Sequence, residues 1–320
     1  MDLSIIIPVY NEVENLVQLY QAILATLSRL PKLSWEVVLV DDGSLDCSLE
    51  VMKKLAQDDP DHVCLVALRR NYGQTTALTA GIDNSSGDMI VLMDADLQND
   101  PADIPLMIEK LTQGYDVVSG WRTDRKDPFL TRILPSRIAN WLISVVTGVY
   151  LHDYGCTLKA YRREVLTGFR LYGEMHRFIP AFANSVGAKI IEIPVSHHPR
   201  QYGKTKYGLG RTIKVILDLF TVKFLMSYAQ NPIYLFGGVG TFLFGLSFLT
   251  VLVLVIRRIW LNEHMIRSPL LLMSTMLFIL GAQSVLLGLL AEVLMRTYHE
   301  SQDKPTYKIK QIIRKEPENE

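Results

Sequence analysis

The sequence is poor in cysteine and has no surplus of charge of either sign. Its 320 residues contain three cysteines, none of them in a CxxC pair, and 33 basic residues balance 33 acidic ones. So few thiols indicate a reducing compartment and argue against a disulfide framework or a thiolate metal cage. Because a basic excess is missing, we expect no nucleic-acid partner.

Two phosphate-binding signatures are also missing. No GxGxxG follows the first predicted strand, and no GxxxxGK[ST] occurs anywhere in the chain. The sequence therefore supports neither a dinucleotide-binding Rossmann site nor a P-loop.

Two long stretches near the C-terminus carry no charge at all. Residues 232–256 and 269–291 contain no Asp, Glu, Lys or Arg, in a chain that is 49% hydrophobic overall. Each has about 25 residues, and at about 1.5 Å per residue such a helix crosses a hydrocarbon core of about 30 Å. The sequence predicts two transmembrane helices, with a buried hairpin of a soluble protein as the alternative.

An amphipathic pattern precedes these stretches. Apolar residues recur at helical spacing from Ile213 to Phe224, while the polar residues of this segment fall on another face. We interpret it as a helix at the membrane surface, with a surface helix of the soluble domain as the alternative. The predicted parts are an N-terminal domain (1–205), a juxtamembrane helix (206–230), a transmembrane hairpin (231–296) and a tail (297–320).

The charges around the hairpin predict its orientation. Basic residues flank it on both outer sides, whereas the loop between its helices holds three arginines, which favours both termini inside. No signal peptide is expected, because the first apolar run is followed at once by Tyr10, Asn11 and Glu12. We expect a multi-pass protein of the inner (plasma) membrane, with the N-terminal domain and both termini cytoplasmic.

The N-terminal domain alternates apolar runs with helical segments. After the run 3–9, Asn11 and Glu14 give a capping-box signal for a helix that continues to about Ser28. Further strands are predicted at 35–40, 63–68, 89–93 and 116–120, and further helices around 48–57 and 75–84. Strands that are apolar on both faces and separated by helices indicate an α/β fold with a mostly parallel sheet and right-handed crossovers.

Acidic residues follow three of the predicted strands. They are Glu12, the pair Asp41 and Asp42, and the pair Asp94 and Asp96. Any one of them alone is explained by helix capping, but ligands of such sheets gather at the carboxyl ends of the strands. The Asp94-Ala95-Asp96 spacing lets two carboxylates face one Mg²⁺ or Mn²⁺ ion, which prefer oxygen ligands.

These motifs resemble glycosyltransferase family 2, whose members are inverting enzymes with the nucleotide-diphosphosugar (GT-A) fold. The matching segments are IIIPVYNE at 5–12, VDDGS at 40–44 and DADLQ at 94–98. The resemblance implies that Asp94, Asp96 and Gln98 hold the metal. It also implies a pocket for a UDP-sugar lined by Pro8, Tyr10, Glu12, Asp41, Asp42, Asp94 and Asp96.

The further resemblance is to the branch that transfers sugars to polyprenyl phosphates. A basic segment follows the fifth strand, and its members are Arg122, Arg125, Lys126, Arg132 and Arg137. We interpret it as a phosphate-binding loop, since arginine forks bind phosphate oxygens; a solvated surface is the alternative. The resemblance favours Arg122 and Arg137, and adds Arg200, Lys204 and Lys206 of PRQYGKTKY, which alternatively serve only as a positive-inside flank.

Asp153 falls where many family members place a catalytic carboxylate. A sugar hydroxyl as acceptor needs a base, whereas a lipid monophosphate already carries a nucleophilic oxygen anion. We therefore expect Asp153 to be essential, either as a base or as a residue that orients substrate. Its histidine neighbour His152, and also His197 and His198, are expected to be structural.

The predicted reaction is an in-line displacement that moves a sugar from UDP to undecaprenyl phosphate, with Asp96, Asp153 and Arg122 as the catalytic residues. Glucose is the favoured sugar by resemblance, ahead of mannose, N-acetylglucosamine and a modified pentose. A processive polysaccharide synthase is a weaker reading, because QxxRW is absent. The alternative from another functional class is a noncatalytic membrane scaffold.

Small-xxx-small pairs in the hairpin are compatible with a homo-oligomer. The C-terminal tail is predicted to be either disordered or an added edge strand of the sheet.

Overall fold

The computed structural model describes residues 1–123, 134–166, 175–199, 219, 221–224, 232–261, 264, 266, 268–301 and 309–314. The chain forms two compact units, which are considered separately. The first comprises Met1–Val222 and Pro305–Glu320, and the second comprises Lys223–Lys304.

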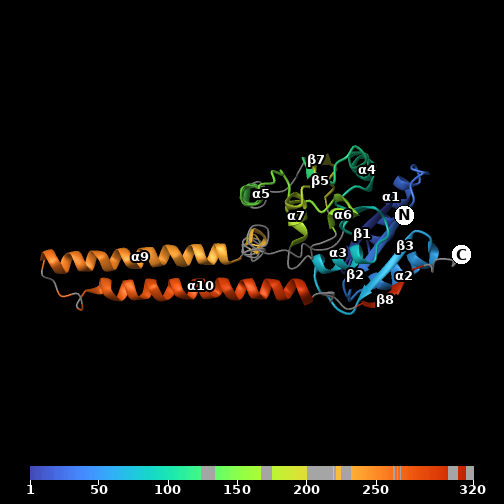
Figure 1. Cartoon of the computed structure of the whole chain (residues 1–320). Helices are drawn as coiled ribbons and strands as arrows, with labels where there is room; N and C mark the ends of the chain where they lie inside the picture. Colours follow the sequence, from blue (N-terminus) through green and yellow to red (C-terminus); the bar gives the residue numbers. More distant parts are fainter. Residues whose placement is uncertain are drawn as a thin grey trace. The chain divides into compact units, whose positions relative to one another are not determined.

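An eight-stranded sheet organises the first unit (Figure 1), in the order β7-β5-β6-β4-β1-β2-β3-β8. Most pairs of neighbouring strands are parallel; β6 pairs antiparallel with β4 and β5, and β8 pairs antiparallel with β3. The expected α/β fold with a mostly parallel sheet is thus confirmed. The strands are β1 (Leu3–Val9), β2 (Trp35–Asp41), β3 (Val63–Leu68), β4 (Met89–Leu92), β5 (Val117–Arg122), β6 (Lys159–Arg162), β7 (Ile190–Val195) and β8 (Ile309–Ile313).

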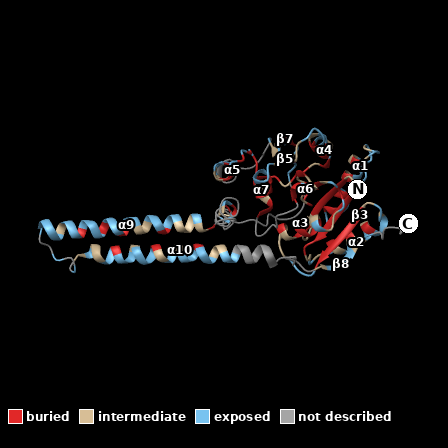
Figure 2. Cartoon of the chain, viewed as in Figure 1, coloured by how far each residue is buried: buried red, intermediate tan, exposed pale blue. Residues whose placement is uncertain are grey.

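Helices connect these strands. The central strands β1, β2 and β3 consist almost wholly of buried residues, which explains why each reads as a continuous apolar run (Figure 2). The helical elements are α1 (Leu16–Leu27), α2 (Ser48–Asp58), α3 (Gln74–Asp83), η1 (Pro101–Asp103), α4 (Ile104–Thr112), α5 (Leu134–Thr147), α6 (Arg163–Leu166), η3 (Met175–Phe178) and α7 (Ile179–Ser185).

The predicted start of the first helix is wrong. Asn11 has a positive φ of 55°, and its Oδ1 accepts a hydrogen bond of 2.8 Å from the Leu45 backbone N–H. Asn11 therefore stabilises the turn after β1 instead of capping a helix. With Asn11 as the cap the helix would begin at Glu12, whereas α1 begins four residues later, at Leu16.

The tail forms an edge strand. Of the two alternatives that the sequence leaves open, the structure shows the strand, since β8 pairs with β3 between Leu65 and Leu68. Next to β8, Arg314 donates to Glu36 Oε2 at 2.8 Å, so charge pairing adds to the strand pairing.

The second unit contains the helices α9 (Pro232–Leu261) and α10 (Pro269–Ser301). Their most apolar windows have mean hydropathies of 2.5 and 2.1, yet only 17% of each window is buried. A core helix of a soluble protein would be mostly buried, so the structure favours two membrane-spanning helices over a buried soluble hairpin. The helices approach closely at Gly240, where a Cβ would lie 2.8 Å from the Gly281 carbonyl oxygen.

Candidate active site

The acidic motifs meet at one edge of the sheet. The Asp42 backbone N–H donates to the Val9 carbonyl at 2.8 Å, and the Met93 N–H donates to the Ile6 carbonyl at 3.1 Å. The first bond places the end of β2 beside the end of β1, and the second places the end of β4 beside the middle of β1, in parallel strands whose carboxyl ends point the same way. Each motif therefore reaches the edge at which the sequence predicts a ligand.

The residues expected at the nucleotide lie around the end of β1. Pro8, Tyr10 and Glu12 are all partly buried. The Glu12 N–H donates to Ser48 Oγ at 2.9 Å, and Glu12 Oε2 accepts from Asn15 Nδ2 at 2.7 Å. The loop after β1 is thereby fixed to the start of α2.

Asp42 fixes a second loop of the site. Asp42 is 3% exposed, and its carboxylate accepts from the backbone N–H groups of Tyr72 at 2.7 Å and Gly73 at 2.9 Å. Burial raises the pKa of Asp42, while these two hydrogen bonds counteract the rise. Asp41 is also buried, and its Oδ1 accepts from the Ser44 N–H at 3.1 Å.

The loop held by Asp42 leads to Gln74, which contacts the DADLQ motif. Gln74 Nε2 donates to Asp94 Oδ1 at 2.7 Å, and Thr157 Oγ1 donates to Asp94 Oδ2 at 2.6 Å. Burial raises the pKa of Asp94 to about 6, and the charge of Asp96 adds to the rise. The effect of Asp96 on Asp94 shows that the two carboxylates repel each other, and a bound cation would offset that repulsion.

The donor set fits a hard divalent ion. The part of the chain that the structure describes contains no cluster of three or more His, Cys, Asp or Glu that could form a complete protein cage. Mg²⁺ is commonly held by one or two carboxylates together with substrate phosphates, which is what Asp94 and Asp96 offer. The Gln98 N–H donates to Asp96 Oδ1 at 3.2 Å, so Gln98 adjoins the same carboxylates.

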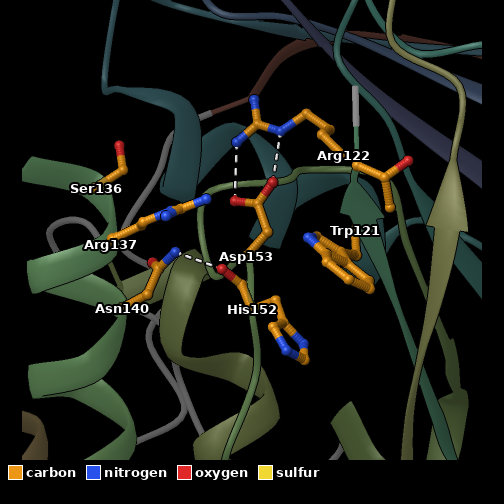
Figure 3. Close-up of a pocket in the computed structure, with 8 residues that line it drawn as sticks. Trp121, Arg122, Ser136, Arg137, Asn140, His152 and Asp153 are labelled. Carbon is orange, nitrogen blue, oxygen red and sulfur yellow. Dashed lines mark hydrogen bonds and ion pairs between the residues drawn. The ribbon is translucent and has the colours of Figure 1, made fainter. Parts of the chain in front are cut away.

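A bidentate ion pair forms the other part of the site (Figure 3). Arg122 at the end of β5 donates from Nε to Asp153 Oδ2 at 2.6 Å and from Nη2 to Asp153 Oδ1 at 2.9 Å. Burial lowers the pKa of the Arg122 guanidinium, but the hydrogen bonds and the charge of Asp153 raise it overall. Asp153 is 3% exposed, so this guanidinium compensates a buried carboxylate.

A pocket of about 240 Å³ opens beside this pair. Arg137 and Asn140 of α5 face it from one side, and Trp121 and His152 from the other (Figure 3). Arg137 is exposed, in contrast to Arg122, whose side chain is 16% exposed. The pocket is lined by Trp121, Arg122, Thr123, Ser136, Arg137, Asn140, His152 and Asp153.

The structure thus brings Arg122, Arg137 and Asp153 together and links them to the acidic edge. The charge of Arg122 counteracts the raised pKa of Asp94, which indicates that the two parts of the site are neighbours. The remaining cations of the predicted acceptor site lie outside the described residues; they are Arg125, Lys126, Arg132, Arg200, Lys204 and Lys206.

The segment that leads to Arg200 runs beside the DADLQ motif. Asn99 and His197 form an isolated antiparallel bridge, and the His198 N–H donates to the Gln98 carbonyl at 2.8 Å. His198 Nε2 also lies 3.1 Å from Asp100 Oδ2. The two histidines therefore contribute to the local structure beside this motif.

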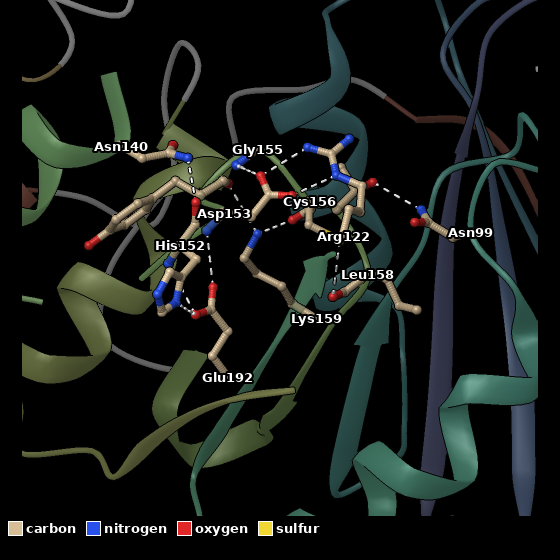
Figure 4. Close-up of polar contacts among 12 residues, drawn as sticks. Asn99, Arg122, Asn140, His152, Asp153, Gly155, Cys156, Leu158, Lys159 and Glu192 are labelled. Carbon is tan, nitrogen blue, oxygen red and sulfur yellow. Dashed lines mark hydrogen bonds and ion pairs between the residues drawn. The ribbon is translucent and has the colours of Figure 1, made fainter. Parts of the chain in front are cut away.

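Several residues of the site were missed by sequence reasoning (Figure 4). Glu192 of β7 accepts from the backbone N–H groups of His152 and Asp153, each at 3.0 Å, and contacts His152 Nδ1 at 2.7 Å. Lys159 donates to the carbonyls of Tyr154, at 3.2 Å, and Cys156. These two residues, with Thr157, hold the loop that carries Asp153. No local motif marks any of them.

Comparisons with known proteins show the family of the chain. Residues 4–169 match the profile of glycosyl transferase family 2. A dodecaprenyl-phosphate galacturonate synthase of Rhizobium johnstonii is 41% identical over 316 residues, which cover 98% of this chain and 93% of that protein. An undecaprenyl-phosphate 4-deoxy-4-formamido-L-arabinose transferase of Edwardsiella ictaluri is 40% identical over 312 residues, which cover 97% and 94%.

A solved structure shares the fold. Glucosyl-3-phosphoglycerate synthase from Mycobacterium tuberculosis, in complex with Mn²⁺, UDP and phosphoglyceric acid, has a TM-score of 0.53 to this chain. The match is 19% identical and covers 69% of this chain and 78% of the other. At this identity the similarity bears on the fold alone, and it agrees with the α/β architecture described above.

Proposed function

This chain belongs to glycosyl transferase family 2, and on that premise we propose that it moves one sugar from a UDP-sugar to a polyprenyl phosphate. The two relatives described above, which match nearly its whole length, are named as polyprenyl-phosphate sugar transferases or synthases. One observation carries the proposal. The acidic edge and the arginine pocket are joined through Thr157, in the same loop as Asp153, so a donor diphosphate and an acceptor phosphate can meet there.

The sugar we propose differs from the one favoured by the sequence. The names of the two relatives specify galacturonate and 4-deoxy-4-formamido-L-arabinose, and neither name supports glucose. We therefore propose a uronic acid or a 4-modified pentose as the transferred group. The modified pentose was one of the alternatives that the sequence left open.

On the donor side, Asp94 and Asp96, with Gln98 beside them, would hold the metal. Mn²⁺ and Mg²⁺ each accompany UDP in structures of the mycobacterial synthase, which shares this fold. When bound here, a divalent ion would neutralise the diphosphate and make UDP a better leaving group. Asp41, Asp42, Pro8, Tyr10 and Glu12 are the candidates for contact with uridine.

On the acceptor side, Arg137 is the residue placed to bind the lipid phosphate. It is exposed, it lines the pocket, and Asn140 lies one turn away on the same helix. Arg122 is already bound by Asp153 at two positions, so it would add fixed positive charge close to the diphosphate.

Asp153 would position Arg122 and not act as a base. Both of its oxygens accept from the guanidinium, and its Oδ1 also accepts from the Gly155 N–H at 3.1 Å. A phosphate monoester has a second pKa of about 6 and needs no proton removed at neutral pH. A single attack of the phosphate on the anomeric carbon, opposite to UDP, would invert the configuration.

The membrane arrangement is also part of the proposal. The helices α9 and α10 would anchor the enzyme, with the catalytic unit and both termini on the cytoplasmic side, as the basic flanks indicate. The acceptor would then be reached at the inner face of the plasma membrane.

Sugar transfer to undecaprenyl phosphate in detergent tests the proposal, with Mg²⁺, Mn²⁺ or EDTA present. The donors are UDP-galacturonate, UDP-4-deoxy-4-formamido-L-arabinose, UDP-glucose, UDP-N-acetylglucosamine and GDP-mannose. We expect a lipid-linked product from one of the first two, at least 100-fold less with EDTA, and a comparable loss in Asp96→Ala. If no donor reacts and donor binding is indifferent to EDTA, the noncatalytic scaffold becomes the better reading.

A further inference from the structure

Helix α5 uses two of its sides for different purposes. Ser136, Arg137 and Asn140 line the pocket, whereas Ile138, Trp141 and Val145 point to solvent. These three apolar side chains are 57%, 64% and 52% exposed, and their spacing of three and four residues places them on one side of the helix. The same helix therefore carries an apolar strip, defined by these three residues, beside a polar pocket wall.

The strip is not the side by which α5 packs on its own domain. Ile143, Ser144 and Thr147 are buried and hold the helix in place. Tyr150, shortly after the helix, is 79% exposed and extends the run of exposed apolar residues. An apolar strip left uncovered on a helix that is otherwise firmly packed marks a contact surface.

Charge and residue type indicate which surface it contacts. Trp and Tyr concentrate at the boundary between headgroups and acyl chains, and α5 contains no acidic residue that anionic headgroups would repel. Arg137, one turn before Trp141, is exposed between the strip and the pocket. An arginine in this position can reach phosphate groups while its neighbours enter the apolar layer.

We propose that α5 lies on the bilayer and inserts Ile138, Trp141 and Val145 at the level of the acyl chain boundary. The inference rests on the proposed function. A polyprenyl phosphate keeps its phosphate at the depth of the lipid headgroups, so a pocket that binds this phosphate must lie at the same depth. Insertion of the strip places Arg137, which lies between the strip and the pocket, level with the phosphate. The helix thereby delivers the pocket to its lipid substrate, independently of the hairpin.

A second copy of the chain is the other partner that could cover the strip. The strip with Tyr150 amounts to a patch on the order of 500 Å². A stable dimer buries about 800 Å² on each partner, so the patch is small for that purpose. Insertion into a bilayer requires no such minimum area.

Spin labels on the full-length protein in nanodiscs test the position of α5. In a Cys47→Ser background, Cys64 and Cys156 are buried, so labels at Trp141→Cys or Val186→Cys are the accessible ones. Val186 is the matched control, because it is 70% exposed and precedes β7, at the opposite end of the sheet from the pocket. We expect the label at 141 to be relaxed more by oxygen than by a water-soluble nickel chelate, and the label at 186 to show the reverse.

Transfer assays supply the second readout. We expect Ile138→Ser/Trp141→Ser/Val145→Ser to lower kcat/KM for undecaprenyl phosphate in vesicles on the order of tenfold. Transfer to a short-chain isoprenyl phosphate dissolved in water should be unchanged, which also shows that the variant is folded. Arg137→Ala should lower both rates, since it acts on the phosphate itself.

Three results would overturn the proposal. One is a label at 141 as accessible to the nickel chelate as that at 186, and another is an equal loss with both acceptors. The third is spin coupling between labels of two copies, which would assign the strip to a dimer. If the wild type transfers no sugar at all, the proposed function fails, while the depth of the label at 141 still decides where α5 lies.

Discussion

Thr157 connects the two parts of the candidate site through a single hydroxyl. It donates to Asp94 at 2.6 Å and accepts from Asn99 Nδ2 at 3.2 Å. Its loop also contains Asp153, the partner of Arg122. A side chain of this kind would set the direction of the proposed metal-binding carboxylate without contacting the metal.

Replacement of Thr157 by valine keeps the shape of the side chain and removes the hydroxyl. We expect the concentration of Mg²⁺ or Mn²⁺ needed for half-maximal transfer to rise about 10- to 100-fold, because a hydrogen bond that orients a metal carboxylate is lost. The measurement is the transfer rate as a function of metal concentration. Thr157→Ser is the control and should retain most of the wild-type behaviour. Identical titrations for Thr157→Val and the wild type would contradict this role.

At the residue scale, the sequence predicts the candidate site residues that stand in motifs, and it does not reveal those that lie outside any motif. Asp94 and Asp96 were found because two acids follow an apolar strand, and the structure places them at the expected edge. Gln74 and Glu192 contact Asp94 and the Asp153 loop only after folding, since 20 and 39 residues separate them from their partners. No spacing rule covers contacts of that range.

At the scale of elements, a buried histidine joins α3 to η3. His176 is 6% exposed, and its Nδ1 lies 2.7 Å from Thr75 Oγ1 at the start of α3. Burial lowers the pKa of His176 to about 3, and the charges of Arg177 and Lys159 contribute further. The contact between the two elements therefore depends on a neutral imidazole.

This contact predicts a loss of stability in acid. Between about pH 6.5 and pH 3 the unfolded chain binds a proton at His176 and the folded chain does not, so stability falls as the pH is lowered through that range. The expected loss is about 2 kcal/mol between pH 7 and pH 5. Thermal unfolding in detergent at both values should therefore show a smaller pH effect in His176→Gln, which retains a partner for Thr75. Equal effects in both proteins would refute the assignment.

The elements that the sequence predicted are those with long, continuous signals. β1 to β4 appear as mostly apolar runs because both faces of the sheet are covered; Ser4 in β1 and Glu36 in β2 are the buried polar exceptions within the runs. The start of α1 was misplaced because Asn11 and Glu14 match a capping box, while the partner of Asn11, the Leu45 N–H, lies 34 residues away. β6, with four residues, is too short for a periodic pattern to reveal it.

At the scale of the whole molecule, the chain returns to the sheet of the first unit after the hairpin. β8 pairs with β3, and Arg314 binds the buried Glu36 of β2. Glu36 also accepts from Ser4 Oγ at 2.7 Å and from the Ser86 N–H. One carboxylate thus ties β1, β2, the turn before β4 and the end of the chain together, so the last strand completes the catalytic unit.

Arg314→Met should therefore destabilise the whole first unit and not only its edge. Glu36 would remain buried without its cation, and because Arg314 is 40% exposed we expect a cost of about 1–3 kcal/mol. The readout is the unfolding temperature in detergent, with transfer activity at low temperature unchanged. The double variant Glu36→Gln/Arg314→Met is the control. It should recover part of the lost stability, since it also removes the unpaired buried charge of Glu36. An unchanged unfolding temperature in Arg314→Met would mean that strand pairing alone holds β8 in the sheet.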